Sequence, residues 1–490
     1  MKVLIAASEC SPLVKVGGIA DVVGSLPIAL REHRIDVRVV IPFYKPLLDF
    51  YEKNTSFKLE TKLETTLKYG PENLKITLVE TKIPNTDIPV YLIQNPDYIS
   101  NGGIYFSPET MSSPDNELIR FAIFSKAICN IFSVENDIFK PDIIHCNDWH
   151  TGLVPQILQN TARLSFSHEK VKTIFTIHNL AYQGFSKLEV AEKLNLNLEY
   201  DQSLRWDAQD DNLDFLLQGI VGTDYVTTVS EKYAQEIQQP EFGEGLHEIL
   251  QARQSRLVGI LNGISYDIFN PSTDNFIANK FTTTDWHEKK ELNKLNLQAK
   301  LGLEINKDKP LIGVVSRLAQ QKGLDLVVDS LNDILKENVQ LVILGTGDPQ
   351  IESKIDGYNT DESKNKNFKG VLKFSEEMAR MIYAGSDMFL IPSRFEPCGL
   401  TQMIAMRYAS LPIVRATGGL YDTVNNEVTG FTFENLNIEE LTQTLKRAIG
   451  FYTNNKAMWN RMVITAMQQD FSWKESAKKY IMVYYKALND

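Results

Sequence analysis

The sequence predicts an α/β protein built from two doubly wound, Rossmann-like domains, and three observations support this. The chain has 490 residues, which exceeds the roughly 250–300 residues at which one hydrophobic core stops growing. Short apolar runs recur along it, each followed by a polar or glycine-bearing loop and a stretch of helical period. Both halves also open alike, with strand, glycine-bearing loop, helix and strand, at 3–42 and at 310–345.

The predicted strands are near-continuous runs of valine, isoleucine and leucine, which are typical of parallel strands covered by helices on both faces. They lie at 3–8, 36–42, 142–146, 172–178, 225–230, 310–316, 339–345, 387–393 and 412–416. The strand signal lapses over 271–309, where the pattern predicts one helix, 286–303. We therefore expect an N-terminal domain over 1–270 and a C-terminal domain over 271–472.

Two further segments carry expectations of their own. Residues 473–490 contain apolar side chains at helical spacing, which predicts an amphipathic helix that packs back on the N-terminal domain. The polar insert 352–370 is expected to be a surface excursion of the second domain.

Charge and composition exclude several classes of function. The chain carries 51 Lys and Arg against 62 Asp and Glu, a net charge of −11, which disfavours nucleic acid and anionic membranes as partners. Four scattered cysteines form no disulfide framework or zinc motif. No apolar run reaches the roughly 18 residues of a membrane span. We expect a cytoplasmic protein, or a plastid stromal one if the chain is a mature plant or algal form.

The loop after the first strand contains Lys15 followed by Gly17 and Gly18, which open a helix. Amides at a helix start bind anions, and bare glycines let a phosphate approach closely. The alternative is a glycine turn beside a solvated lysine. Asp21 lies in the first helical turn, where a carboxylate complements the helix dipole.

Other strands of the first half end in polar side chains. Asp148 and Trp149 follow one strand, where they suit hydrogen bonding to and stacking on a sugar, and His178 follows the next. His145, Asp148 and His150 lie close together in the sequence, but their spacing matches no zinc signature. A structural role for His178 is the alternative to a role in the site.

In the second half, Arg317 and Lys322 stand five residues apart between a strand and a helix, where two cations would hold a diphosphate. A solvated basic loop is the alternative. Glu396 precedes another helix, where a carboxylate binds sugar hydroxyls or caps the helix.

Taken together, these segments resemble the glycogen and starch synthase family of retaining glucosyltransferases, which have the two-domain GT-B fold. The collinear motifs are KVGGIADV (15–22), HCNDWHTG (145–152), HNLAYQG (178–184), TVSEKYAQEI (228–237), GILNGISYDIFNP (259–271), SRLAQQKGLDL (316–326), SRFEPCGLTQ (393–402) and TGGLYDTV (417–424). The resemblance implies two domains facing across a deep cleft. It also implies transfer of glucose from ADP-glucose, or alternatively UDP-glucose, to the non-reducing 4-hydroxyl of an α-1,4-glucan, releasing the nucleoside diphosphate.

The resemblance also assigns roles to individual residues. It implies a catalytic set of Asp148, His178, Arg317, Lys322 and Glu396; a donor-binding set of Lys15, Gly17, Gly18, Asn262, Phe374, Cys398, Gly399, Leu400 and Thr401; and acceptor contacts at Tyr105 and Asp21. It implies no metal and no pyridoxal phosphate. The expected partners are therefore the nucleotide-sugar and a maltooligosaccharide, glycogen or starch acceptor.

The sequence departs from the family pattern in the segment DFLLQG. Asp214 stands where family members have asparagine, and Leu217 stands where they have lysine. Ile404 occupies the position of a second glutamate found in many GT-B relatives, which disfavours a mechanism needing two carboxylates. We expect a front-face reaction in which the leaving phosphate accepts the acceptor's proton. The competing interpretations are another GT-B glucosyltransferase and a catalytically silent glucan-binding or scaffold relative.

Overall fold

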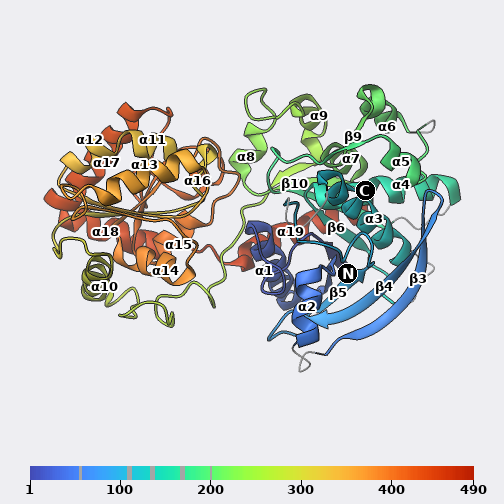
Figure 1. Cartoon of the computed structure of the whole chain (residues 1–490), viewed down its shortest axis with the longest axis horizontal. Helices are drawn as coiled ribbons and strands as arrows, with labels where there is room; N and C mark the ends of the chain where they lie inside the picture. Colours follow the sequence, from blue (N-terminus) through green and yellow to red (C-terminus); the bar gives the residue numbers. More distant parts are fainter. Residues whose placement is uncertain (54–57, 108–112, 133–137, 166–170, 199–200) are drawn as a thin grey trace. The chain divides into compact units, whose positions relative to one another are not determined.

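The computed structural model describes residues 1–53, 58–107, 113–132, 138–165, 171–198 and 201–490 (Figure 1). The chain forms two compact units. The first comprises Met1–Val229, Ala234–Leu261 and Trp473–Asp490, and the second comprises Ser230–Tyr233 and Asn262–Ser472. The units thus separate after Leu261, where the sequence pattern had suggested a junction after residue 270.

A nine-stranded sheet runs through the first unit in the order β11-β10-β7-β6-β1-β2-β5-β4-β3. Its strands are β1 (Lys2–Ala6), β2 (Asp36–Pro42), β3 (Glu60–Tyr69), β4 (Glu72–Lys82), β5 (Pro89–Gln94), β6 (Ile143–Asn147), β7 (Lys172–Ile177), β10 (Tyr225–Thr228) and β11 (Leu257–Gly259). From β11 through β5 all neighbours pair in parallel, whereas β4 pairs antiparallel with β5 and with β3.

Helices cover this sheet, and a short ribbon lies beside it. The helices are α1 (Gly18–Glu32), α2 (Lys45–Lys53), α3 (Pro114–Ile131), α4 (Leu153–Ser165), α5 (Glu189–Lys193), α6 (Gln202–Asp207), α7 (Phe215–Gly222), α8 (Glu231–Glu236), α9 (His247–Ala252) and α19 (Trp473–Asn489), with 3-10 turns η1 (Trp149–Thr151), η2 (Ala208–Asp210) and η3 (Gln254–Arg256). The ribbon pairs β8 (Phe185–Lys187) with β9 (Asn212–Asp214) in antiparallel fashion. α8 begins among the residues grouped with the second unit.

The last helix, α19, belongs to the first unit and packs against α1 and β7. Its Tyr480 and Tyr484 are fully buried. The ring of His145, on β6, lies 2.8 Å from the Tyr484 hydroxyl through Nδ1 and 2.6 Å from Thr176 Oγ1 through Nε2. A hydrogen-bonded histidine in the sheet therefore fixes α19 in place.

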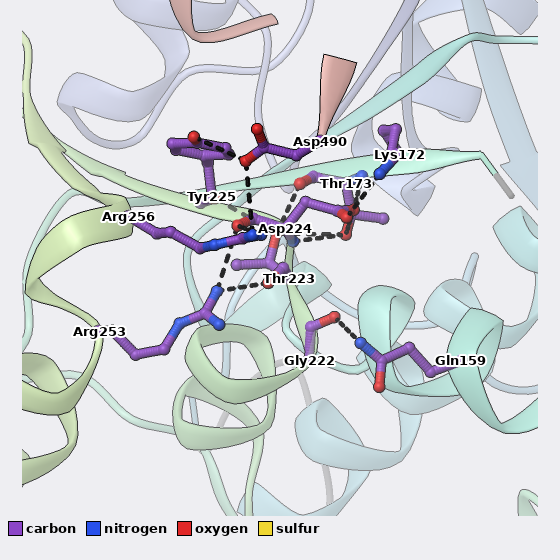
Figure 2. Close-up of polar contacts among 10 residues, drawn as sticks. All are labelled: Gln159, Lys172, Thr173, Gly222, Thr223, Asp224, Tyr225, Arg253, Arg256 and Asp490. Atoms are coloured by element: carbon purple, nitrogen blue, oxygen red, sulfur yellow. Dashed lines mark hydrogen bonds and ion pairs between the residues drawn. The ribbon is translucent and has the colours of Figure 1, made fainter. Parts of the chain in front are cut away.

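The end of α19 is held at the amino ends of β7 and β10 (Figure 2). The Tyr225 hydroxyl donates to Asp490 Oδ2 at 2.9 Å, and Arg256 lies 3.4 Å from the same oxygen. Arg256 also donates to the carbonyl of Asp224, whose carboxylate accepts from Lys172. Segments far apart in the sequence thus meet in one polar cluster on the side of the sheet opposite the strands' carboxyl ends.

The second unit contains a fully parallel six-stranded sheet in the order β14-β13-β12-β15-β16-β17. Its strands are β12 (Leu311–Val315), β13 (Gln340–Leu344), β14 (Phe368–Val371), β15 (Met388–Ile391), β16 (Leu411–Arg415) and β17 (Phe431–Phe433). Counted from the first strand, this is the 3-2-1-4-5-6 order of a Rossmann fold.

The helices of the second unit complete its layers. They are α10 (Trp286–Leu301), α11 (Leu324–Asp329), α12 (Leu331–Lys336), α13 (Pro349–Thr360), α14 (Glu376–Gly385), α15 (Thr401–Arg407), α16 (Gly418–Thr423), α17 (Ile438–Asn454) and α18 (Lys456–Met467), with the 3-10 turn η4 (Gln320–Lys322). The two sheets and their helices confirm the predicted α/β class with two doubly wound domains.

The helix predicted over 286–303 is present as α10, although its sequence is strongly polar. Two of its lysines are buried in the unit. Lys294 Nζ lies 2.7 Å from Asp387 Oδ2, and Lys290 Nζ donates to the carbonyls of Tyr383 and Tyr408, at the ends of α14 and α15. Burial lowers the pKa of Lys290 to about 7. The polar residues of α10 thus satisfy buried groups that would otherwise lack partners.

The expectation for 352–370 is wrong, because this segment is largely regular structure. Most of α13 and the first residues of β14 fall within it. Ile351 and Ile355, one helical turn apart, and Phe368 are buried. The many charged residues around these apolar positions hid their periodicity in the sequence. In the described part of the chain, no helix has the length and hydropathy needed to cross a bilayer.

Candidate functional site

Three neighbouring strands of the first sheet end beside the predicted site residues. The loop carrying Lys15 follows β1, Asp148 follows β6, and His178 follows β7; these strands are adjacent in the order β7-β6-β1. The chain leaves β1 toward β2 on one side and returns through β6 on the other. Such a switch point, at the carboxyl ends of parallel strands, is where doubly wound sheets bind ligands.

The Glu9 carboxylate accepts hydrogen bonds from the glycine loop after β1. The sequence interpretation did not identify this residue. Glu9 is 1% exposed. Its Oε2 accepts from the Gly17 amide at 2.8 Å and from the Val16 amide, and its Oε1 accepts from the Tyr105 hydroxyl. Gly17 was predicted to turn its amide toward a diphosphate, but that amide is committed to Glu9. An acidic residue directly after a buried strand was the signal available in the sequence.

The remaining predicted residues of this loop face outward. Gly18 is the first residue of α1, and a Cβ added to it would meet no atom within 4 Å. Lys15 is exposed and forms an ion pair of 2.7 Å with Asp21 in the first turn of α1. The resemblance implies that Lys15 binds the donor and Asp21 the acceptor. The structure brings their side chains together.

Asp148 and His178, predicted separately, are linked directly. Asp148 has a φ of 55°, outside the usual range for a non-glycine residue. Its Oδ1 accepts from the His178 amide at 2.6 Å. The side-chain amide of Asn147 donates to the carbonyls of Ala6 and His145, which leaves its Oδ1 to accept from His178 Nε2 at 2.9 Å. This network places the imidazole proton on Nε2.

Burial sets the protonation of this pair. It lowers the pKa of His178 to about 3 and raises the pKa of Asp148 to about 7. The histidine is therefore uncharged at neutral pH, and it cannot serve as a strong general acid there. A neutral imidazole beside a carboxyl group suits hydrogen bonding to sugar hydroxyls.

The other histidines of HCNDWH have structural roles. His145 is bound by Thr176 and Tyr484, as described above. The His150 ring stacks on Trp149, with centroids 4.1 Å apart, and lies 5.4 Å from the ring of Tyr105. Within the described ranges, no three His, Cys, Asp or Glu side chains are grouped so that they could hold a metal ion.

The second sheet has its own switch point, between β12 and β15, and the predicted cations lie there. Lys322 Nζ lies 2.9 Å from Glu396 Oε1 and 2.7 Å from Oε2. Ser393 donates to the same carboxylate at 2.9 Å. Arg317, in the loop after β12, is exposed. The catalytic lysine and glutamate implied by the resemblance are therefore direct partners, and the exposed Arg317 lies five residues before Lys322 in the sequence.

Paired glycines from the next strand shape the loop that carries Glu396. A Cβ on Gly418 would lie 2.0 Å from the Glu396 carbonyl oxygen, and one on Gly419 would lie 2.0 Å from that of Cys398. The Gly419 amide donates to the Glu396 carbonyl at 3.1 Å.

Gln402 is a second residue that the sequence interpretation did not identify. It is fully buried, and its side-chain amide donates to the carbonyls of Cys398 and Gly399.

The remaining donor-side predictions differ in exposure. Phe374 is 90% exposed, as a ring available for stacking on a base would be. Asn262 is buried, and its Oδ1 has no hydrogen-bond partner among the described residues.

The predicted residues around the start of α15 are partly or fully buried. Cys398 is buried, which raises the pKa of its thiol to about 12. Leu400 and Thr401 are half-buried at the start of α15. Ile404 is buried in α15, so this position supplies core packing.

Asp214 and Leu217, which depart from the family pattern in DFLLQG, have structural roles in the first unit. Asp214 caps α7 by accepting from the Leu217 amide at 3.0 Å, and Leu217 is buried. The Asp214 amide in turn donates to Asp207 Oδ2, which also accepts from Gln218. Burial raises the pKa of Asp214 to about 7 and that of Asp207 to about 6. The acidic segment 207–214 is therefore partly buried and hydrogen-bonded.

Comparison with known proteins identifies the family. The starch synthase catalytic domain model matches residues 2–252, and the model of glycosyl transferases group 1 matches residues 298–459. A glycogen synthase of Clostridium acetobutylicum is 41% identical over 501 residues, covering 100% of both chains. The chain belongs to the glycogen and starch synthase family. It is accordingly a glucosyltransferase that acts on a glucan.

Solved structures agree with this family and with its GT-B fold. The catalytic domain of starch synthase IV from Arabidopsis thaliana, bound to ADP and acarbose, matches with a TM-score of 0.87 and 32% identity, covering 100% of this chain and 99% of that one. A sucrose-phosphate synthase from Thermosynechococcus elongatus matches with a TM-score of 0.58 at 18% identity, covering 100% of this chain and 99% of that one, which shows the fold alone.

Proposed function

We propose that this family member transfers glucose from ADP-glucose to the non-reducing 4-hydroxyl of an α-1,4-glucan with retention of configuration. The observation that carries the proposal is the Lys322–Glu396 pair at the switch point of the second sheet. The Arabidopsis structure, bound to ADP and acarbose, supports a nucleoside diphosphate and a glucan-like sugar as ligands.

In this proposal the second unit binds the diphosphate. Arg317 is exposed and free to turn toward phosphate oxygens, whereas Lys322 must divide its three donors between Glu396 and the phosphate. Their positive charges stabilise the negative charge that grows as the glucose–phosphate bond breaks. Phe374 stacks on the base, and the backbone of 398–401 lines the glucose and phosphate.

In this proposal the first unit binds sugars. Asp148 and the neutral His178 hydrogen-bond to the transferred glucose, while Lys15 and Gly18 contact the donor. Tyr105 and Asp21 contact the acceptor. Because no second carboxylate stands at Ile404, we propose a front-face reaction in which a phosphate oxygen of the leaving group accepts the proton of the attacking hydroxyl.

A diphosphate-release assay tests this function. The protein is supplied with ADP-glucose or UDP-glucose, each with and without a maltooligosaccharide. We expect acceptor-dependent release from ADP-glucose and much slower release from UDP-glucose. Proton NMR of the first product should show an α-1,4 linkage, whereas a β linkage would contradict retention. Release from neither donor, with glucan binding retained, would instead favour a silent glucan-binding protein.

A further inference from the structure

One buried carboxylate joins the two sides of the first unit's site. Glu9 follows β1 and is surrounded by three donors. Its Oε2 accepts from the amides of Val16 and Gly17, which directly precede the first residue of α1. Its Oε1 accepts from the Tyr105 hydroxyl, 96 residues away in the sequence.

The carboxylate occupies the place that an anionic ligand takes at a helix start. Amides there point outward and carry partial positive charge, which stabilises a negative group. A carboxylate that is 1% exposed needs such donors to offset its loss of water. Glu9 therefore acts as an internal anion that fixes the path of the glycine loop ahead of α1.

Tyr105 is held as firmly on the other oxygen. Its hydroxyl also lies 2.9 Å from Ser8 Oγ. Burial is the main cause that raises the pKa of Tyr105, so the phenol stays protonated and remains a donor to Glu9. Its ring lies against His150, which stacks on Trp149 beside Asp148.

We propose that Glu9 is a positioning residue for glucosyl transfer, which couples the loop carrying Lys15 to the acceptor-side Tyr105. This inference rests on the proposed function, because that function assigns Lys15 to the donor and Tyr105 to the glucan. Glu9 does not touch either substrate. It acts through the two groups that its carboxylate oxygens hold.

The substitutions Glu9→Gln and Tyr105→Phe together test the two contacts of the Glu9 carboxylate. Glutamine has one acceptor oxygen and an amide that only donates. One neutral oxygen would have to replace two charged ones for three donors, and a neutral oxygen accepts more weakly than a carboxylate oxygen. We therefore expect E9Q to weaken both sides of the site, and Tyr105→Phe to weaken the glucan side alone.

Steady-state kinetics with ADP-glucose and maltoheptaose, each varied at saturating partner, measures this coupling. We expect E9Q to raise the KM of each substrate about tenfold, the size of one lost hydrogen bond to a charged group. Y105F should raise only the KM for maltoheptaose. In the double variant E9Q/Y105F, the increase in the KM for maltoheptaose should not exceed that of the larger single variant. Both substitutions disrupt the same contact, the hydrogen bond between Glu9 and Tyr105.

Several results would overturn the coupling. It is wrong if E9Q leaves either KM at the wild-type value, if Y105F raises the donor KM equally, or if the glucan effects of the two variants add. Glu32→Gln, at an exposed position at the far end of α1, is the matched control and should behave as wild type.

Two measurements keep this test independent of folding and of turnover. If thermal unfolding shows that E9Q does not fold, Glu9→Asp, which keeps two acceptor oxygens on a shorter side chain, should raise both KM values in the same direction. Calorimetric titration with ADP and with maltoheptaose reports the same pattern without catalysis. A wild-type protein that binds both ligands but releases no diphosphate contradicts the proposed function alone. Equal binding by wild type and E9Q contradicts the coupling alone.

Discussion

In the first unit, the candidate site residues Tyr105, Asp148 and His178 are half-buried and hydrogen-bonded, whereas the second unit combines an ion pair with exposed groups. In the first unit, burial keeps His178 neutral and raises the pKa of Asp148. In the second, Lys322 is paired with Glu396, while Arg317 and Phe374 face solvent.

This difference matches the chemistry of two kinds of ligand. Neutral, preoriented polar groups suit sugar hydroxyls, which carry no charge and need directional hydrogen bonds. Cations suit a diphosphate, whose charge grows as the sugar departs. The contrast predicts that loss of the Lys322 charge in the second unit mainly affects turnover, and that a change at the buried Asp214 in the first unit mainly affects stability.

The largest effect is expected from Lys322→Gln. It removes a positive charge but leaves an amide that can still donate to Glu396. Turnover should fall about 100- to 1,000-fold, the range seen when one stabilising donor is removed from a developing anion. The free energy of unfolding should change far less, as measured by chemical denaturation. Lys336→Gln, in an exposed pair with Asp333, is the control, and equal turnover in the two variants would remove Lys322 from the mechanism.

Asp214→Asn tests the first unit, because it restores the amide typical of the family. An acid whose folded pKa is raised to about 7 stabilises the fold below its unfolded pKa, and this stability is lost as pH rises through 7. Asparagine keeps the cap on α7 without a charge. D214N should therefore be more stable than wild type by about 2–4 kcal/mol at pH 8, with no gain near pH 4.

Denaturant unfolding of wild type and D214N across pH 4–8 measures that difference. Asp211→Asn, an exposed change in the same segment, controls for the loss of one negative charge. A D214N gain that is the same at pH 4 and pH 8 would show that ionisation of Asp214 is not its cause.

Gly419→Ala tests the backbone packing behind Glu396. The new Cβ would lie 2.0 Å from the Cys398 carbonyl oxygen, so the loop or α16 must shift. We expect a loss of about 1–3 kcal/mol in the free energy of unfolding, as for other overpacked sites, and a parallel loss of turnover. Gly357→Ala, in α13 with no atom within 4 Å of the added Cβ, should instead be neutral or stabilise by about 0.5–1 kcal/mol.

The smallest effect is expected from Tyr484→Phe. It removes the hydroxyl that lies 2.8 Å from His145 Nδ1 and leaves that nitrogen buried. The melting temperature should fall, because the free energy of unfolding decreases by about 0.5–1.5 kcal/mol. Turnover should stay unchanged. Tyr485→Phe, whose ring is 54% exposed, provides the control. Equal melting temperatures for the two variants would mean that this bond does not hold α19.

The sequence by itself determined the class of the fold, most of its parallel strands and the loops that carry the site. These features depend on neighbours in the chain: apolar runs form buried strands, and glycines open helices. The antiparallel strands β3 and β4 were not predicted, because polar residues interrupt their apolar positions and leave no continuous apolar run. The segment 352–370 was misjudged because charges masked a few buried positions.

Only the tertiary structure decided how the site residues are partnered. Glu9 meets Tyr105 across 96 positions, and Lys322 meets Glu396 across 74. It also decided that Gly17 gives its amide to Glu9 and that His178 is neutral. Hydrogen bonding and burial depend on which strand ends become neighbours in a sheet, and that order is set by the packing of the whole domain, which no local pattern encodes.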